Sequence, residues 1–148
     1  MGLRDLGMEK EFNLTPGDLA TRLGFNKRRL PYQFNKLRHV SGLTPWSDGR
    51  LFETKPTPDC LNLNQLHWHQ LAGVHAISRI IFTAKPDLQH ETGVLIADEV
   101  GLGKTAQALS FIAFLNQCIS LRERGMGPPP ILGESCLAVS EYSLKILT

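Results

Sequence analysis

Residues 93–115 read GVLIADEVGLGKTAQALSFIAFL, and their pattern indicates a fold. The apolar run at 94–97 contains β-branched residues, as expected for a strand that is buried on both faces. A turn with glycines follows at 98–104, and the pattern from Thr105 to about Arg122 predicts a helix. The predicted apolar stripe of this helix consists of Ala108, Phe111, Ile112, Leu115 and Ile119. A strand, a turn and a helix in this order predict an α/β fold.

The turn ends in Gly101-Leu102-Gly103-Lys104-Thr105, which resembles the end of a phosphate-binding P-loop in its required place between strand and helix. Glycines let backbone N–H groups approach phosphate oxygens, and the N-terminus of the helix adds a positive dipole. Lys104 is expected to reach the β- and γ-phosphates, and the Thr105 hydroxyl is expected to ligate Mg²⁺. The sequence therefore predicts a site for ATP and Mg²⁺.

A second helix is predicted before this unit. Asn64 can cap its start, and Lys85-Pro86-Asp87 breaks the pattern at its end. Between them, apolar residues recur at helical spacings: Leu66, Leu71, Val74, Ile77, Ile80 and Ile81. We therefore expect a polar arm or linker at 1–60, followed by an ATP-binding domain at 61–148.

The arm at 1–60 contains one predicted helix and one basic stretch. Thr15 can cap the helix, Pro16 suits its first position, Asp18 lies in its first turn, and Gly24 can close its end. The stretch 22–38 then carries six basic residues and no acidic one, interleaved with Phe25, Tyr32 and Phe34. Such a stretch either tracks a phosphate backbone, with an aromatic ring stacked on bases, or is a solvated basic loop. We expect the arm to be loosely structured.

Two segments resemble motifs of one family. Residues 93–115 resemble motif I of the SWI/SNF family of helicase-like, ATP-dependent DNA translocases and chromatin remodellers. The full P-loop pattern has a glycine five residues before Gly103, but that family has an acid there, and this chain has Asp98. The segment 66–74, LHWHQLAGV, resembles the adenine-reading stretch of the family, with His69 in place of the usual tyrosine and with Gln70 matching.

The resemblance covers about residues 61–132 and implies a fold, a site and a setting. The implied fold is a partial RecA-like P-loop lobe, a parallel sheet with helices, preceded by the basic arm. Gln70 is implied to hydrogen-bond the adenine edge, with His69 stacked near it. The nucleotide-binding residues implied by motif and resemblance are Gln70, Asp98, Glu99, Val100, Gly101, Leu102, Gly103, Lys104 and Thr105. DNA or chromatin are the implied partners, and the nucleus is the implied location.

Hydrolysis is not expected of this chain. ATPases of the family carry a downstream Asp-Glu pair after an apolar strand, together with a second lobe that supplies an arginine. After Glu99 the sequence has no Asp, and its acids are Glu123, Glu134 and Glu141. The run 136–139 lacks the Pro and Trp that flank the next strand of the family. We therefore expect a truncated form that binds ATP weakly and does not hydrolyse it.

Two other functions compete with ATP binding in a DNA-dependent ATPase. The chain could be a non-enzymatic DNA-binding fragment that uses the basic stretch 22–38. It could also be a small stand-alone P-loop NTPase, which would need another acid to hold Mg²⁺, such as Glu99 or Glu134. Neutralising Arg28 and Arg29 would weaken DNA binding in the first case, and Mg²⁺-dependent turnover without DNA would mark the second.

Composition limits the remaining possibilities. The net charge of 148 residues is +2, so a claim of nucleic-acid binding must rest on local clusters. Three cysteines without a CxxC pair argue against a disulfide framework, and the longest mostly apolar stretch, 106–119, is shorter than a membrane span. Metal binding by Cys60 and the histidines at 67, 69 and 75 is not expected, because positions 67 and 69 point to different faces of a helix. The composition indicates a reduced, intracellular protein.

Overall fold

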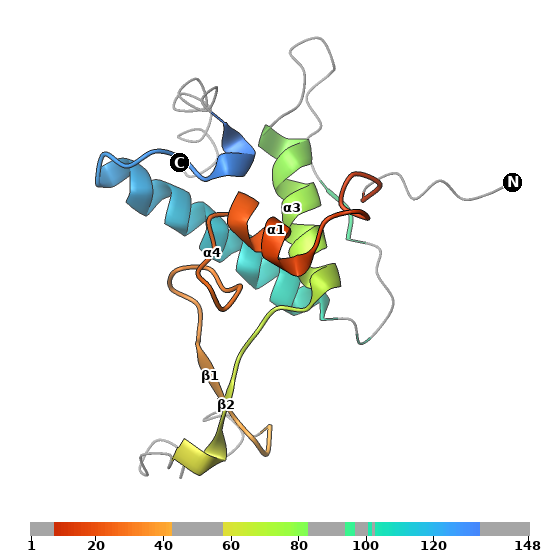
Figure 1. Ribbon diagram of the computed structural model, residues 1–148, viewed down its shortest axis with the longest axis vertical. Helices are drawn as coiled ribbons and strands as arrows, with labels where there is room; N and C mark the ends of the chain where they lie inside the picture. Colours follow the sequence, from red (N-terminus) through yellow and green to blue (C-terminus); the bar gives the residue numbers. More distant parts are fainter. Residues whose placement is uncertain (1–7, 43–57, 83–93, 97–100, 102, 134–148) are drawn as a thin grey trace, which may run out of the picture.

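The computed structural model describes residues 8–42, 58–82, 94–96, 101 and 103–133 (Figure 1). Three helices, α1, α3 and α4, cross one another in a single body, and a two-stranded ribbon extends from it. The elements in chain order are α1 (Pro16–Arg22), β1 (Leu37–His39), the short 3-10 helix η1 (Pro58–Cys60), β2 (Leu61–Leu63), α3 (Trp68–Phe82), α4 (Lys104–Glu123) and the 3-10 helix η2 (Pro130–Leu132).

Helix α1 begins and ends where its local sequence predicts. The Thr15 hydroxyl accepts the N–H of Asp18 at 3.1 Å, and the Asp18 carboxylate accepts the N–H of Thr15 at 3.0 Å. This reciprocal pair is a capping box, and Pro16 occupies the first helical position. Gly24 follows the last residues with φ +66°, a conformation that favours glycine. The prediction for this helix is confirmed.

Helices α3 and α4 confirm the two longer predictions with one shift in a boundary. Helix α4 spans Lys104–Glu123, as expected. Helix α3 starts at Trp68, after the predicted cap Asn64, whose side chain donates instead to the carbonyl of Asn35 at 3.1 Å. The Asn64 N–H donates to the carbonyl of Lys36 at 2.8 Å, so this residue continues the pairing of the ribbon. The local sequence predicts a cap at Asn64, but hydrogen bonds to Asn35 and Lys36, the two residues before β1, occupy this residue instead.

One apolar core joins α1, α3 and α4. The rings of Phe25 and Phe114 meet edge to face at 6.3 Å between centroids. The buried members of the core are Leu19, Ala20, Leu23, Phe25, Leu30, Leu66, Leu71, Ala72, Val74, Phe114 and Leu132. Each fully buried leucine or phenylalanine contributes about 1.5–3 kcal/mol relative to an exposed one. Because residues 19–30 supply nearly half of this core, the expectation of a loosely structured arm is wrong for the described part of that segment.

The predicted α/β fold with a parallel, RecA-like sheet is wrong. Within the described ranges, the sheet consists of β1 and β2, which pair antiparallel with Leu37 opposite Leu63. Residues 94–96 form no strand, and Leu95 is 88% exposed. An apolar run becomes a central strand only when neighbouring strands pair with both its edges, and no described strand pairs with this one. Ala97 lies outside the described residues.

The orientation of α4 also differs from the prediction. The helix buries Gln107, Ser110, Phe114 and Gln117, while Ile112 is 55% exposed. Ile119 and Ala108 of the predicted stripe are exposed as well. The buried glutamines are accommodated because α3 and the loop after α1 offer backbone carbonyls to their amides.

No helix in these described ranges is long and apolar enough to cross a membrane.

Candidate functional site

The predicted phosphate-binding turn leads directly into α4. Gly101 and Gly103 have φ values of +93° and +83°, a backbone conformation that residues other than glycine rarely adopt. Gly103 is the N-cap of α4, and no side chain caps the helix there. Its carbonyl accepts the N–H of Gln107 at 3.1 Å, the first bond of the helix. The N–H groups of a first helical turn have no carbonyl partner within their own helix, so this end of α4 is suited to an anion.

The chemistry-bearing side chains of the motif lie in that first turn. Lys104 is half-buried and Thr105 is exposed. They are the first two residues of α4, in the turn whose N–H groups have no carbonyl partner within the helix. The other predicted residues of the motif, Asp98, Glu99, Val100 and Leu102, lie outside the described residues.

Gln70, predicted from a separate stretch of sequence, lies against the same turn. A Cβ atom added to Gly103 would be 2.5 Å from the side-chain nitrogen Nε2 of Gln70. The side-chain oxygen of Gln70 accepts the N–H of His67 at 2.9 Å, which satisfies one open donor at the start of α3. The carboxamide of Gln70 is buried and therefore oriented: its oxygen holds α3, and its nitrogen faces Gly103. The structure thus brings two of the predicted segments together.

Gln107 is a residue that sequence reasoning missed. Its side chain is fully buried, and its Cδ lies 2.9 Å from where a Cβ of Gly73 would be. Its Nε2 donates a long hydrogen bond of 3.5 Å to the carbonyl of His69. The missing side chain at Gly73 lets α4 approach α3 here, and Gln107 holds the two helix starts together. A polar residue within a largely apolar helix was the available signal.

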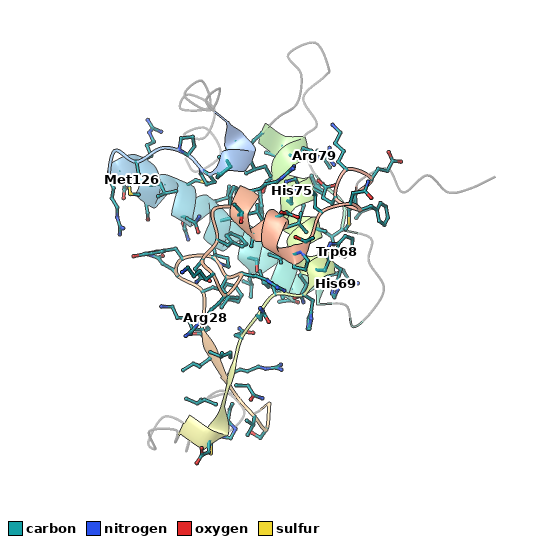
Figure 2. The ribbon with its side chains drawn as sticks, in the orientation of Figure 1. Arg28, Trp68, His69, His75, Arg79 and Met126 are labelled. Atoms are coloured by element: carbon teal, nitrogen blue, oxygen red, sulfur yellow. The ribbon has the colours of Figure 1, made fainter. Side chains whose placement is uncertain are left out.

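Trp68 and His69 lie at the start of α3, directly after His67 in the chain (Figure 2). The rings of His67 and His69 stack with 5.7 Å between centroids and 9° between planes. The expectation that they face different ways is wrong, because His67 precedes the helix. Trp68 lies between them in sequence but donates its indole N–H to the carbonyl of Leu14 at 2.8 Å and stacks on Phe12. In the described ranges no group of three or more His, Cys, Asp or Glu could hold a metal.

A buried ionic cluster lies on the other end of α3 and has no signal in the sequence. Glu11 is fully buried, and its Oε1 accepts from Nδ1 of His75 at 2.7 Å and from Nε of Arg79 at 3.0 Å. Burial alone would raise the pKa of Glu11, but the hydrogen bonds and charges of Arg79 and His75 hold that pKa below its ordinary value. Its partners are more than sixty residues away in the chain, so no local pattern marks them.

His75 is the titratable partner in this cluster. Burial lowers the pKa of His75 below its ordinary value, and the charges of Arg22 and Arg79 act in the same direction, against Glu11. Its Nε2 is buried without a hydrogen-bond partner among the described residues. When the ring is neutral, the bond to Glu11 places its proton on Nδ1, which leaves Nε2 as an unpaired acceptor.

The basic stretch folds partly into the core and partly onto the surface. Phe25 is buried and Phe34 is half-buried, so these rings are not available to a ligand in full. Tyr32 is 58% exposed.

No family model matches the chain, and neither a curated protein nor a solved structure matches it. Functional proposals therefore rest on this geometry and on the motif.

Proposed function

We propose that the chain binds ATP together with Mg²⁺ at the start of α4. One observation supports this above all: Gln70 and the Gly101–Thr105 turn, predicted as parts of one nucleotide site from separate segments, are in contact through Gly103. The turn has two glycines at positive φ and ends in the uncapped N-terminus of a helix of 20 residues. Such an end attracts phosphate through its N–H groups and its dipole.

Each group then has a defined task. The N–H groups of the first turn of α4 and the ammonium of Lys104 bind phosphate oxygens. The Thr105 hydroxyl ligates a Mg²⁺ ion that the phosphates carry. Gln70 closes the turn from the α3 side, so that the backbone at Gly103 keeps its left-handed conformation. In this arrangement the buried carboxamide of Gln70 positions the turn from the α3 side.

The resemblance to SWI/SNF-type ATPases extends the proposal to a DNA-linked process in the nucleus. Under this proposal the 148 residues hold ATP but lack the Asp-Glu pair that follows an apolar strand in those ATPases, since the acids after Glu99 are Glu123, Glu134 and Glu141. Glu123 lies at the far end of α4 from the turn. We therefore expect binding of ATP without steady turnover.

Titration with a fluorescent ATP analogue in Mg²⁺ buffer tests the proposal. Wild type should bind it, unlabelled ATP should compete, and Lys104→Ala should weaken binding about 10-fold or more, as expected for a lost charge-assisted contact. Lys10→Ala is the matched control, because Lys10 is an exposed lysine outside the turn. Absence of binding by the folded wild type, or equal binding by both alanine variants, would refute the proposal.

A turnover assay separates the rival enzyme. Release of inorganic phosphate from ATP by wild type, abolished by Lys104→Ala and independent of DNA, would favour the stand-alone NTPase instead. Release that Lys104→Ala leaves unchanged would point to a contaminating ATPase. No release, combined with binding that depends on Lys104, is the expected result.

A further inference from the structure

The basic stretch contains a loop, residues 26–30, that is stabilised by the hydrogen bonds of Asn26. The side-chain oxygen of Asn26 accepts the N–H groups of Arg28 at 2.9 Å and Leu30 at 3.3 Å. Its backbone N–H donates to the carbonyl of Leu30 at 3.1 Å, and its carbonyl accepts the N–H of Arg29 at 2.8 Å. Phe25 and Leu30, on either side, are core residues. The loop therefore presents the cations of residues 27–29 on a backbone that is anchored at both ends.

Arg29 occupies a backbone conformation that costs free energy. Its φ is +62°, and it is the one residue other than glycine with positive φ in the described ranges. For a side chain other than Gly or Asn, this conformation is unfavourable. Gly would fit the turn better, so the arginine is retained at a cost in stability. Arg29 is half-buried beside the exposed Lys27 and Arg28. A strained residue that carries a charge in such a loop is an indication of a binding role.

Tyr32 adds an aromatic ring whose backbone and side chain are both in contact with residues of α4 or directly after it. Its backbone N–H donates to Oε1 of Gln117 at 3.1 Å, and Nε2 of the same buried glutamine donates to the carbonyl of Gly24 at 2.8 Å. The guanidinium of Arg124 lies 5.6 Å from the centroid of the Tyr32 ring. Helix α4 and the residue after it thus hold both ends of Tyr32, while more than half of the residue stays exposed.

A hollow of about 390 Å³ lies along the residues that follow, lined by Tyr32, Gln33, Phe34, Asn35, Lys36 and Leu37. It is open to solvent, and its lining combines two aromatic rings, two amides and a cation. Aromatic rings stack on nucleobases, amides pair with base edges, and cations bind phosphates. No acidic residue occurs between Asp18 and Asp48, so this surface carries no charge that would repel phosphate from within its own stretch.

We propose that residues 26–38 bind single-stranded nucleic acid. The five cations of this segment, Lys27, Arg28, Arg29, Lys36 and Arg38, contact the phosphate backbone. Tyr32 stacks on one base, and the amides of Gln33 and Asn35 bond its edge. A single strand is favoured over a duplex because the bases of a duplex are stacked and paired, so neither the ring nor the hollow could engage one. An acidic peptide offers charge for the cations but no flat ring for Tyr32.

This surface is separate from the proposed ATP site. Figure 2 shows Arg28 where the ribbon leaves the helical body, well apart from His69 at the start of α3. The two proposals therefore fail or succeed independently. Lys104→Ala should leave binding of nucleic acid unchanged, and changes in the 26–38 surface should leave binding of ATP unchanged.

The test is fluorescence anisotropy with a labelled 20-nucleotide oligothymidine, with a 20-base-pair duplex as the comparison and the whole chain as the protein. The single strand should bind more tightly. Its association constant should fall with salt with a log–log slope of about −3.5, which corresponds to about five phosphate contacts. Tyr32→Ala should weaken binding about five- to 150-fold, whereas Tyr32→Phe should keep it within about twofold.

Arg29→Gly is the most discriminating variant. It removes the charge and relieves the positive φ, so the protein should become more resistant to urea while its affinity for the oligonucleotide falls. Lys10→Ala is the control for loss of one positive charge elsewhere. Equal affinity for the duplex, equal effects of Tyr32→Ala and Tyr32→Phe, or competition by polyglutamate or anionic vesicles as strong as by unlabelled oligothymidine would overturn the proposal.

Discussion

The side-chain nitrogen of Gln70 lies so close to Gly103 that a Cβ atom added to the glycine would be 2.5 Å from it. This contact joins the first turn of α3 to the residue that precedes α4. It also explains why the turn needs glycine twice over: φ at Gly103 is +83°, and the space beside its Cα is filled. The candidate nucleotide site is therefore held from the α3 side by a residue that also stabilises α3 itself.

Gly103→Ala should destabilise the protein by about 1–3 kcal/mol, because alanine is strained at positive φ and collides with Gln70. The double variant Gly103→Ala with Gln70→Ala should recover the part of the loss that is due to the collision. Urea unfolding of wild type, both single variants and the double variant measures the coupling between the two sites. Strictly additive losses would show that Gln70 does not contact Gly103 in solution.

The orientation of α4 predicts a large loss of stability on truncation of one apolar residue and almost none on truncation of another two positions away. Phe114 is fully buried, so Phe114→Ala should cost about 3–5 kcal/mol of the free energy of unfolding. Ile112 is 55% exposed, so Ile112→Ala should change it by no more than about 0.5 kcal/mol. Urea unfolding again provides the measurement. A loss above about 2 kcal/mol for Ile112→Ala would show that this side of α4 is buried in solution.

The stability of the protein should fall as the pH falls below about 6.5, the ordinary pKa of histidine. The pKa of His75 is lowered in the folded state, so the unfolded chain binds more protons in this range and gains stability relative to the folded chain. Glu11, whose folded pKa is also lowered, adds a loss in the same direction below about pH 4.3.

His75→Gln isolates the histidine contribution, because glutamine can still donate to Glu11 but does not titrate. The difference in free energy of unfolding between wild type and this variant should shrink or reverse between pH 7.5 and 5.5. Unfolding in urea at a series of pH values gives this difference. A difference that stays constant across the range would contradict the assignment.

Arg79→Met should destabilise the protein by roughly 2–3 kcal/mol, because it leaves the buried Glu11 carboxylate with one partner in place of two. We expect a smaller loss of stability than for a wholly buried ion pair, because 22% of the Arg79 side chain is exposed. Adding Glu11→Gln should restore part of the stability, since the uncompensated charge is then gone. If Arg79→Met alone is neutral, the ion pair contributes nothing to stability.

Features that depend on near neighbours in the chain were predictable. The start of α1 was predicted correctly because a capping box forms between Thr15 and Asp18, three residues apart. The extent of α4 was predicted for the same reason: helical spacing and the residues at its ends act over one or two turns. The positive φ of Gly101 and Gly103 is likewise a local property, and the motif indicated a turn there.

Partners from distant parts of the chain decided the rest. The run 94–96 has the composition of a buried strand, but that composition suits an interior only where neighbouring strands pair with it, and in the described structure they do not. The side of α4 that is buried depends on the carbonyls and the glycine that face Gln107 and Gln117. By itself the sequence determined the helices and the glycine turn, because those follow from bonds within a few residues. Only the tertiary structure decided that Gln70 meets Gly103 and that Glu11 meets His75, because such contacts depend on how separate segments pack.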